Sequence, residues 1–292
     1  MKEDFEHYLV MKRLKSTRNL HESVKQFQEW LKGENLEETQ VRYTDVLSYV
    51  KKLKEKCWKP SSIAASMNGI RHYYDFLEVS SNPVDKVSLK GTKQQKVIDL
   101  LSPVELETIY KDYPPEMEML DVITQRNLVI LGLLLFQGVT VAELRKLTTR
   151  DVKIRLGTVY IPGSRTSNGR ELELKPVQAL DLQTYLTSGR AQTVSCFGLD
   201  TDKLLVASSE VQGVKAVDNM VTKLLKELKS RFPKVKSAYQ IRASVIVRWI
   251  KVTNLREAQN RAGHRYISST EKYLKNDLEG LQDAVNKHHN MG

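Results

Sequence analysis

The amino-acid sequence predicts a mainly α-helical protein with a small β-sheet, divided into two domains. Apolar residues recur at helical spacing through the first 80 residues, and no strand pattern is found there. The helical pattern is lost over residues 80–101, a stretch that contains Asn-Pro, a glycine and several lysines. Beyond it, two segments of strand character, 152–163 and 170–176, flank the polar turn SRTSNG.

The N-terminal region is expected to form a domain of four helices. Gly33 follows the second helix as a stop signal, and Pro60 stands where a fourth helix begins. The expected helices span residues 1–14, 20–32, 44–56 and 60–79. Three aromatic residues of the fourth helix are expected to lie in the core of this domain: Tyr73, Tyr74 and Phe76.

The second domain is predicted to begin with a helix at Ser102. This serine and Glu105 have the spacing of a capping box, and Pro103 occupies the first helical position. Further helices are expected at about 120–136, 177–188, 213–231, 238–251 and 255–262. The predicted organisation is therefore a helical domain over 1–88, a basic linker over 89–101 and a second domain over 102–292.

The composition favours an anionic partner. The chain has 40% hydrophobic and 28% charged residues, which is typical of globular proteins, and carries a formal net charge of +11 with a pI near 9.4. A positive excess of this size favours nucleic acid as the partner, although a basic surface that only faces water has the same composition.

The sequence has no feature of a secreted or membrane protein. No apolar run approaches the ~20 residues that span a bilayer, and the longest, LVILGLLLF at 128–136, is expected to form a buried helix. The N-terminus has no apolar signal-peptide region, so a cytoplasmic location is expected. Cys57 and Cys196 match no metal-binding spacing and are expected to be free, buried thiols.

The segment AGHRYISSTEKYL places His264 nine residues ahead of Tyr273. On one continuous helix these two side chains would lie on opposite faces. A break is predicted between them, because Gly263 ends the preceding helical run and Ser268 with Glu271 forms a capping box that starts a new helix at the next residue. Such a break permits the two side chains to converge.

Three segments of the second domain, read together with the junction NPVDKV and SPVELE, resemble the tyrosine recombinase (phage integrase) family. The segments are GVTVAELRKLTTRDV (138–152), AYQIRASVIVRWI (238–250) and AGHRYISSTEKYL (262–274). The likeness covers nearly the whole chain and is to the minimal, two-domain type of the family. It implies an N-terminal four-helix core-binding domain and a C-terminal α+β catalytic domain.

The resemblance implies a site-specific DNA recombinase or integrase, which would serve a mobile genetic element, such as a phage or a transposon, or the chromosome. In the family, a tyrosine hydroxyl attacks a backbone phosphate to give a 3′-phosphotyrosyl link, and a second strand then attacks that link. The reaction uses no metal and no other cofactor. The implied partners are double-stranded DNA and further protomers, either in a homotetramer on paired sites or in an assembly with another recombinase.

The resemblance also implies roles for three residues that match the family's motifs. Tyr273 matches the nucleophile, His264 a donor to the scissile phosphate, and Arg242 one arm of a guanidinium clamp on the phosphate. A phosphorane-like transition state concentrates negative charge on the nonbridging oxygens, which forked guanidinium donors neutralise well.

Three other positions depart from the family's pattern. Thr140 stands where the family has its first clamp arginine, Ser164 where it has a lysine in a strand turn, and Tyr239 where it has a histidine. Arg165, beside Ser164, is a candidate electrostatic stand-in near the leaving oxygen. Arg126, on the preceding helix, is a candidate to refill the site of the first arginine.

These departures leave two functions open. One is a competent recombinase with substituted helper residues; the other is a catalytically silent DNA-binding relative that occupies recombination sites or assembles with an active recombinase. Tyr239 is equally consistent with a core aromatic and with a phosphate donor. The apolar stripe of the C-terminal tail, 278–292, could pack on its own domain or dock on a neighbouring protomer.

Overall fold

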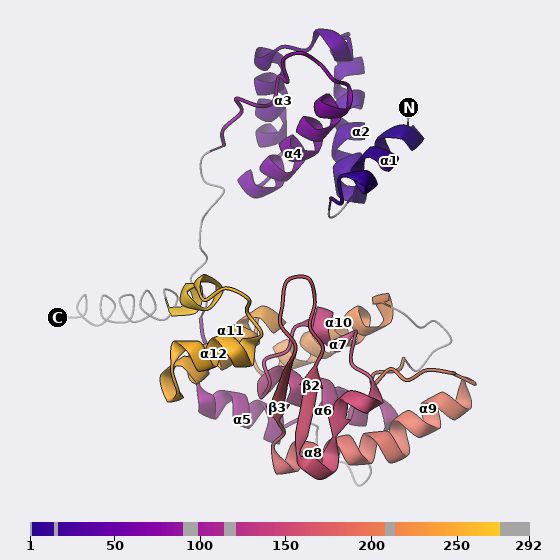
Figure 1. Ribbon diagram of the computed structural model, residues 1–292, viewed down its shortest axis with the longest axis vertical. Helices are drawn as coiled ribbons and strands as arrows, with labels where there is room; N and C mark the ends of the chain where they lie inside the picture. Colours follow the sequence, from indigo (N-terminus) through magenta and orange to yellow (C-terminus); the bar gives the residue numbers. More distant parts are fainter. Residues whose placement is uncertain (1, 15–16, 90–98, 114–120, 208–213, 275–292) are drawn as a thin grey trace, which may run out of the picture. The chain divides into compact units, whose positions relative to one another are not determined.

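The computed structural model describes residues 2–14, 17–89, 99–113, 121–207 and 214–274. The chain divides into two compact units, unit 1 (Met1–Lys96) and unit 2 (Val97–Gly292) (Figure 1). Both are built mainly from helices, and unit 2 also contains a three-stranded sheet, so the predicted fold class is confirmed. The exact limits of the domains stay a prediction, because most of the expected linker over 89–101 lies outside the described residues, as does the tail over 278–292.

Unit 1 contains the four expected helices. They are α1 (Lys2–Met11), α2 (Thr17–Gly33), α3 (Tyr43–Glu55) and α4 (Pro60–Phe76), with a short 3-10 turn, η1 (Glu38–Gln40), between α2 and α3. Helices α1 and α4 end three residues earlier than predicted, because Arg13 and Glu78 adopt left-handed backbone angles, with φ of 51° and 53°. Pro60 occupies the first turn of α4, as expected.

The core of unit 1 is rich in aromatic side chains from its helices. Phe27 and Trp30 of α2 stack with ring centroids 5.7 Å apart. Tyr73 and Tyr74 of α4 are buried, as predicted, and Phe76 is half-buried against the same packing. Burial of these large rings supplies much of the apolar area that stabilises a domain of this size.

Unit 2 is organised around one central helix, α6 (Val122–Leu135). Every residue of α6 from Gln125 to Leu135 is buried, which confirms the buried helix that the apolar run predicted. Helix α6 contacts α5 (Pro103–Lys111), α8 (Pro176–Thr184), α9 (Arg190–Cys196), α10 (Val214–Arg231) and α11 (Ala238–Val252). Two further helices are α7 (Val141–Leu144) and α12 (Leu255–Ala262), and a 3-10 turn, η2 (Thr149–Asp151), precedes the sheet. Ser102 and Glu105 form the predicted capping box at the start of α5.

The sheet of unit 2 has three short antiparallel strands in the order β1-β2-β3. They are β1 (Val152–Lys153), β2 (Thr158–Ile161) and β3 (Arg170–Glu173). The prediction of one strand over 152–163 is wrong, because a 3-10 turn, η3 (Ile154–Leu156), and Gly157 at φ of 63° divide it into two. Along β3 the side chains alternate, so that Arg170 and Leu172 point inward.

The helix predicted over 177–188 is longer than expected. A π-helical segment, η4 (Tyr185–Gly189), joins α8 directly to α9, and the helical stretch ends only at Cys196. Gly189, within this stretch, is a point of close approach: its amide donates to the Gln125 side chain at 3.0 Å, and a Cβ there would lie 2.7 Å from that oxygen.

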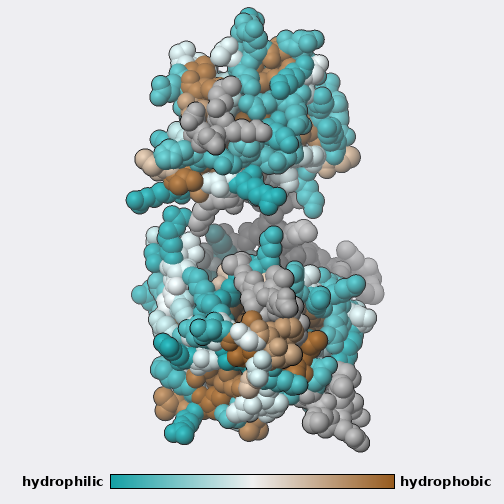
Figure 2. Space-filling view, turned by 90° about the vertical axis from the view of Figure 1, so that its right-hand side faces the viewer, coloured by the Kyte–Doolittle hydropathy of each residue, from teal (hydrophilic) through white to brown (hydrophobic). Residues whose placement is uncertain are grey.

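The surface of both units is largely hydrophilic on the face that Figure 2 shows, with apolar areas on both and larger ones on unit 2. Cys57 and Cys196 are exposed, so the prediction of buried thiols is wrong; each lies at the end of a helix, where the chain faces solvent. Across the ranges that the structure describes, no helix is long and apolar enough to cross a bilayer.

Candidate active site

Helix α11 carries two of the predicted site residues, Tyr239 and Arg242. The helix begins where the Ser237 hydroxyl accepts a hydrogen bond from the Gln240 amide at 3.1 Å. Three residues apart, Tyr239 and Arg242 lie on the same side of the helix. Arg242 is buried, whereas Tyr239 is 57% exposed. The alternative that Tyr239 is a core aromatic is therefore wrong, because its side chain faces solvent although its neighbours Gln240 and Ile241 in the same turn are buried.

The connection after α12 carries His264 back toward α11. Gly263 ends α12 at φ of 70°, as predicted. Helical conformation resumes at Ser268, close to the predicted start, and the Tyr266 and Ile267 carbonyls accept the first hydrogen bonds of the new turn, from the Ser269 and Thr270 amides at 3.0 and 2.8 Å. This break places His264 and Tyr273 on the same side of the chain.

Tyr273 lies at the centre of a cluster of predicted site residues and is buried. Its ring stacks on the His264 ring, with centroids 5.8 Å apart and planes 8° from parallel. The Tyr239 ring lies 6.3 Å away at 39°. Arg242 and Tyr239 are both within hydrogen-bonding reach of the Tyr273 side chain. Four residues that are separated in sequence thus converge.

The guanidinium of Arg242 is held from several sides. Its Nη1 donates to the Gly138 carbonyl, and its Nη2 donates to the Ala262 carbonyl at 2.8 Å. Nη2 also lies 3.3 Å from His264 Nε2, and the Glu143 carboxylate lies 3.7 Å from Nη1. Burial lowers the pKa of Arg242, but an arginine remains charged at any physiological pH. The side chain is therefore a fixed positive charge beside Tyr273.

The contacts of His264 define its tautomer. Because Arg242 can only donate, His264 Nε2 accepts, and Nδ1 carries the proton and donates to the Thr270 hydroxyl at 2.9 Å. Burial lowers the pKa of His264 to about 4, and the positive charges of Arg242 and Arg170 act in the same direction. The ring is therefore neutral at pH 7, and donation from Nε2 to a phosphate requires protonation or a change of tautomer.

Two further charged residues, Glu143 and Arg170, belong to this cluster, although the sequence motifs predicted no role for them. Arg170 Nη1 lies 2.6 Å from Glu143 Oε1, and Arg170 Nε donates to the Arg261 carbonyl at 2.7 Å. Burial alone would raise the pKa of Glu143, but the hydrogen bond and charge of Arg170 hold it below its ordinary value. The sequence did contain one signal for Arg170: side chains alternate along strand β3, and this alternation points residue 170 inward.

Thr140, at the first position that departs from the family's pattern, is the N-cap of α7. Its backbone amide and its hydroxyl both donate to Glu143 Oε2, at 2.8 and 2.9 Å, and its hydroxyl accepts from the Glu143 amide at 3.2 Å. Its side chain is thus occupied by a capping box, which satisfies helix-end amides.

The turn between β2 and β3 carries Ser164 and Arg165. The Ser164 hydroxyl lies 2.9 Å from the Ser167 hydroxyl, within the turn itself. Arg265 Nη2 donates to the Ser164 carbonyl at 3.0 Å, and Ser167 forms an isolated β-bridge with His264. The turn therefore lies beside the histidine, and Arg165 is exposed on it.

Arg126 lies apart from this cluster. It is buried on α6, and its Nη2 donates to Asn127 Oδ1 at 3.2 Å. Burial lowers its pKa, and the groups that oppose this effect are Tyr185, Tyr113 and Asp121 rather than the residues around Tyr273. The structure thus does not bring Arg126 to the position of Thr140.

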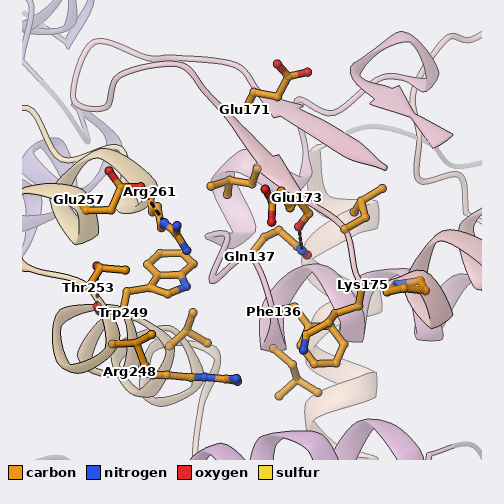
Figure 3. Close-up of a pocket in the computed structure, with 16 residues that line it drawn as sticks. Phe136, Gln137, Glu171, Glu173, Lys175, Arg248, Trp249, Thr253, Glu257 and Arg261 are labelled. Atoms are coloured by element: carbon orange, nitrogen blue, oxygen red, sulfur yellow. Dashed lines mark hydrogen bonds and ion pairs between the residues drawn. The ribbon is translucent and has the colours of Figure 1, made fainter. Parts of the chain in front are cut away.

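A groove of about 590 Å³ borders the site, between β3, the end of α6, α11 and α12 (Figure 3). Gln137 Nε2 donates to the Glu173 carbonyl at 2.7 Å, and Arg261 pairs with Glu257 at 2.9 Å. The groove lies next to the site, because its lining residues are involved in holding the two buried arginines. The carbonyl of Gly138, which follows Gln137, accepts a hydrogen bond from Arg242, and the carbonyl of Arg261 accepts one from Arg170.

The cluster combines a hydroxyl, a guanidinium and a neutral imidazole around one position. Such a set can supply a nucleophile together with donors to an anion. Among the residues that the structure describes, no group of three or more histidine, cysteine, aspartate and glutamate side chains is arranged to hold a metal ion.

Comparisons with known proteins agree with this description. Residues 3–79 match the model of the phage integrase N-terminal SAM-like domain. The tyrosine recombinase XerC of Oceanobacillus iheyensis is 25% identical, over 90% of this chain and 86% of the relative. XerD of the same organism is 24% identical, over 98% of this chain and 97% of the relative. A tyrosine recombinase of Pseudothermotoga lettingae is 26% identical, over 90% and 88%.

Solved structures show the same fold. XerH site-specific recombinase bound to difH substrate gives a TM-score of 0.71 at 14% identity, over 94% of this chain and 82% of that chain. The Tn1549 transposon integrase with circular intermediate DNA gives 0.67 at 15% identity, over 96% and 98%. Unit 1 is thus of the phage integrase N-terminal class. Over nearly its whole length the chain is similar to tyrosine recombinases, as its motifs predicted.

Proposed function

We propose that this protein is a site-specific DNA recombinase in which Tyr273 is the nucleophile. The observation that carries the proposal is the convergence of Tyr273, His264 and Arg242 from segments that a helix break brings together. Relatives that match most of the chain are named tyrosine recombinases, which supports the same function.

In the proposed reaction, the Tyr273 hydroxyl oxygen forms a bond to a backbone phosphorus and the bond from phosphorus to the 5′-oxygen breaks. The phenolic proton is lost and the leaving 5′-oxygen gains a proton. Attack by a 5′-hydroxyl of another strand reverses these steps and rejoins the DNA. The phosphotyrosyl ester conserves the bond, so no external energy source is required.

Arg242 is the residue that we assign to the phosphate. A guanidinium that is charged at all working pH values and has its donors in a fixed fork suits the nonbridging oxygens of a phosphate. Tyr239, whose ring lies beside that of Tyr273, would add a neutral donor, and Arg165 adds positive charge at the nearby turn.

The proposed substrate is duplex DNA, held by a chain of net charge +11. Contacts to phosphates release counterions, so the affinity should fall steeply as the salt concentration rises. We assign the active form to an assembly on paired sites, either a homotetramer or a complex with another recombinase.

A second candidate is a catalytically silent DNA-binding relative, and one observation favours it. The side chains of Thr140 and Ser164 both form hydrogen bonds within their own turns, at positions where the family resemblance expects an arginine and a lysine. On this alternative, the fold binds recombination sites without cutting them.

A covalent-adduct assay separates the two candidates. The protein is incubated with nicked duplexes taken from the flanks of its own gene and analysed on a denaturing gel. We expect an adduct that is absent with Tyr273→Phe and present with the matched control Tyr266→Phe, which alters an exposed tyrosine of the same segment. Salt-sensitive binding without an adduct, even with Thr140→Arg, would leave the silent relative as the function.

A further inference from the structure

Two arginines share one buried carboxylate behind Tyr273. Arg170 and Glu143 form an ion pair in which both side chains are almost fully buried, 5% and 8% exposed. Arg242 lies on the other side of the same carboxylate, at 3.7 Å compared with 2.6 Å for Arg170. Glu143 is therefore paired more closely with Arg170 than with Arg242.

The charges of this cluster decide what Arg242 can offer to a phosphate. Arg170, Arg242 and Glu143 sum to one positive charge, and the neutral His264 adds none. Without Arg170, the carboxylate and Arg242 would cancel each other. Within a buried site such cancellation is strong, because charges there are poorly screened.

The packing around Arg170 holds its guanidinium in one place. Its Nε is bound to the Arg261 carbonyl at 2.7 Å, and a Cβ on Gly263 would lie 2.6 Å from its Nη1. Its Nη2 is buried and, within the described part of the chain, has no hydrogen-bond partner. A buried donor without a partner is unfavourable for folding, so stability alone would not select this arrangement.

We propose that Arg170 is a positioning residue of this site, which neutralises Glu143 and so leaves the charge of Arg242 available to the scissile phosphate. The inference rests on the proposed function, because it concerns the same site and the same step. It would let Arg242 serve the phosphate in a chain that has a threonine at position 140.

The test compares adduct formation by Arg170→Gln, Arg170→Lys and the double variant Arg170→Gln/Glu143→Gln. With Arg170→Gln, Glu143 is expected to pair with Arg242, and the adduct yield should fall on the order of 10²-fold, as on loss of one transition-state donor. Arg170→Lys should recover part of the yield. The double variant should exceed Arg170→Gln, because no carboxylate remains to cancel Arg242.

A purely structural role of Arg170 predicts the opposite order, with the double variant no better than Arg170→Gln, and that result would overturn the inference. Arg155→Gln is the matched control: it removes an exposed arginine of the same sheet region and should leave the yield unchanged.

A second readout separates failure of the inference from failure of the proposed function. Nitrogen NMR of the full-length histidine-labelled chain follows the titration of His264, identified by its loss in His264→Gln. In Arg170→Gln the pKa of His264 should rise, because one nearby positive charge is gone. An unchanged titration would contradict the inference, whether or not the chain cleaves DNA. Absence of any adduct from the unaltered chain would contradict the proposed function alone.

Discussion

The site contains inner residues, such as Arg242, and outer residues, such as Thr140 and Ser164, and the two groups are held in place by different kinds of contact. Arg242, an inner residue, donates to carbonyls 104 and 20 positions away in the sequence. Thr140 and Ser164, which are outer residues, bond to side chains only three positions on. A residue held by distant segments cannot change without disturbing all of them. A residue whose contacts lie within its own turn can be replaced by another residue that suits the turn. Thr140 and Ser164, which depart from the family's pattern, are both held in this way.

The largest effect is expected at Glu143, which contacts both Arg242 and Thr140 and therefore links the two groups of residues. Glu143→Gln leaves two buried guanidinium groups without a charged partner, and loss of one member of a buried ion pair costs about 3–5 kcal/mol. We expect the free energy of unfolding of unit 2 to fall by this amount, measured by hydrogen exchange of the α11 amides in the full chain. Glu171→Gln, at an exposed glutamate of β3, is the control and should change little. Equal effects of the two variants would show that the buried cluster is not a stabilising link.

A smaller effect is expected from pH, through His264. Its pKa is about 4 in the folded chain and about 6.5 when unfolded. The folded state therefore favours the neutral ring, and this contribution to stability is complete above pH 6.5 and is lost as the pH falls toward 4. The groups around the ring are Arg242, Arg170, Glu143 and Tyr273. We expect the difference in α11 exchange protection between the unaltered chain and His264→Gln to shrink over this range. A difference that is constant with pH would contradict the assignment of a neutral histidine.

The smallest effect is expected at Thr140 and sharpens the comparison. Thr140→Ala removes the N-cap of α7, and loss of such a cap costs about 1 kcal/mol. Thr140→Ser keeps the hydroxyl and should retain most of the stability, measured by the same exchange experiment. An adduct yield that falls much further than the stability with Thr140→Ala would indicate that the threonine contacts the phosphate as well as the helix end.

The sequence predicted the features that depend on local patterns. These include the buried helix α6, the capping box at Ser102 and the helix stop at Gly263. It did not predict the π-helical join at Gly189, because that glycine is required by the approach of Gln125 from another helix. It placed Tyr273, His264 and Arg242 in one site through their motifs, but it assigned no role to Glu143 and Arg170. The link between those two residues spans two elements, so no local pattern contains it.

Gly263 has a consequence for how relatives of this protein can diverge. A side chain at this position would meet Arg170 Nη1 at 2.6 Å and the Asn168 carbonyl at 3.0 Å. We therefore expect positions 170 and 263 to change together, because a larger residue at 263 would clash with the arginine at 170. Among natural sequences of this kind, an arginine at the first position and a glycine at the second should be inherited together.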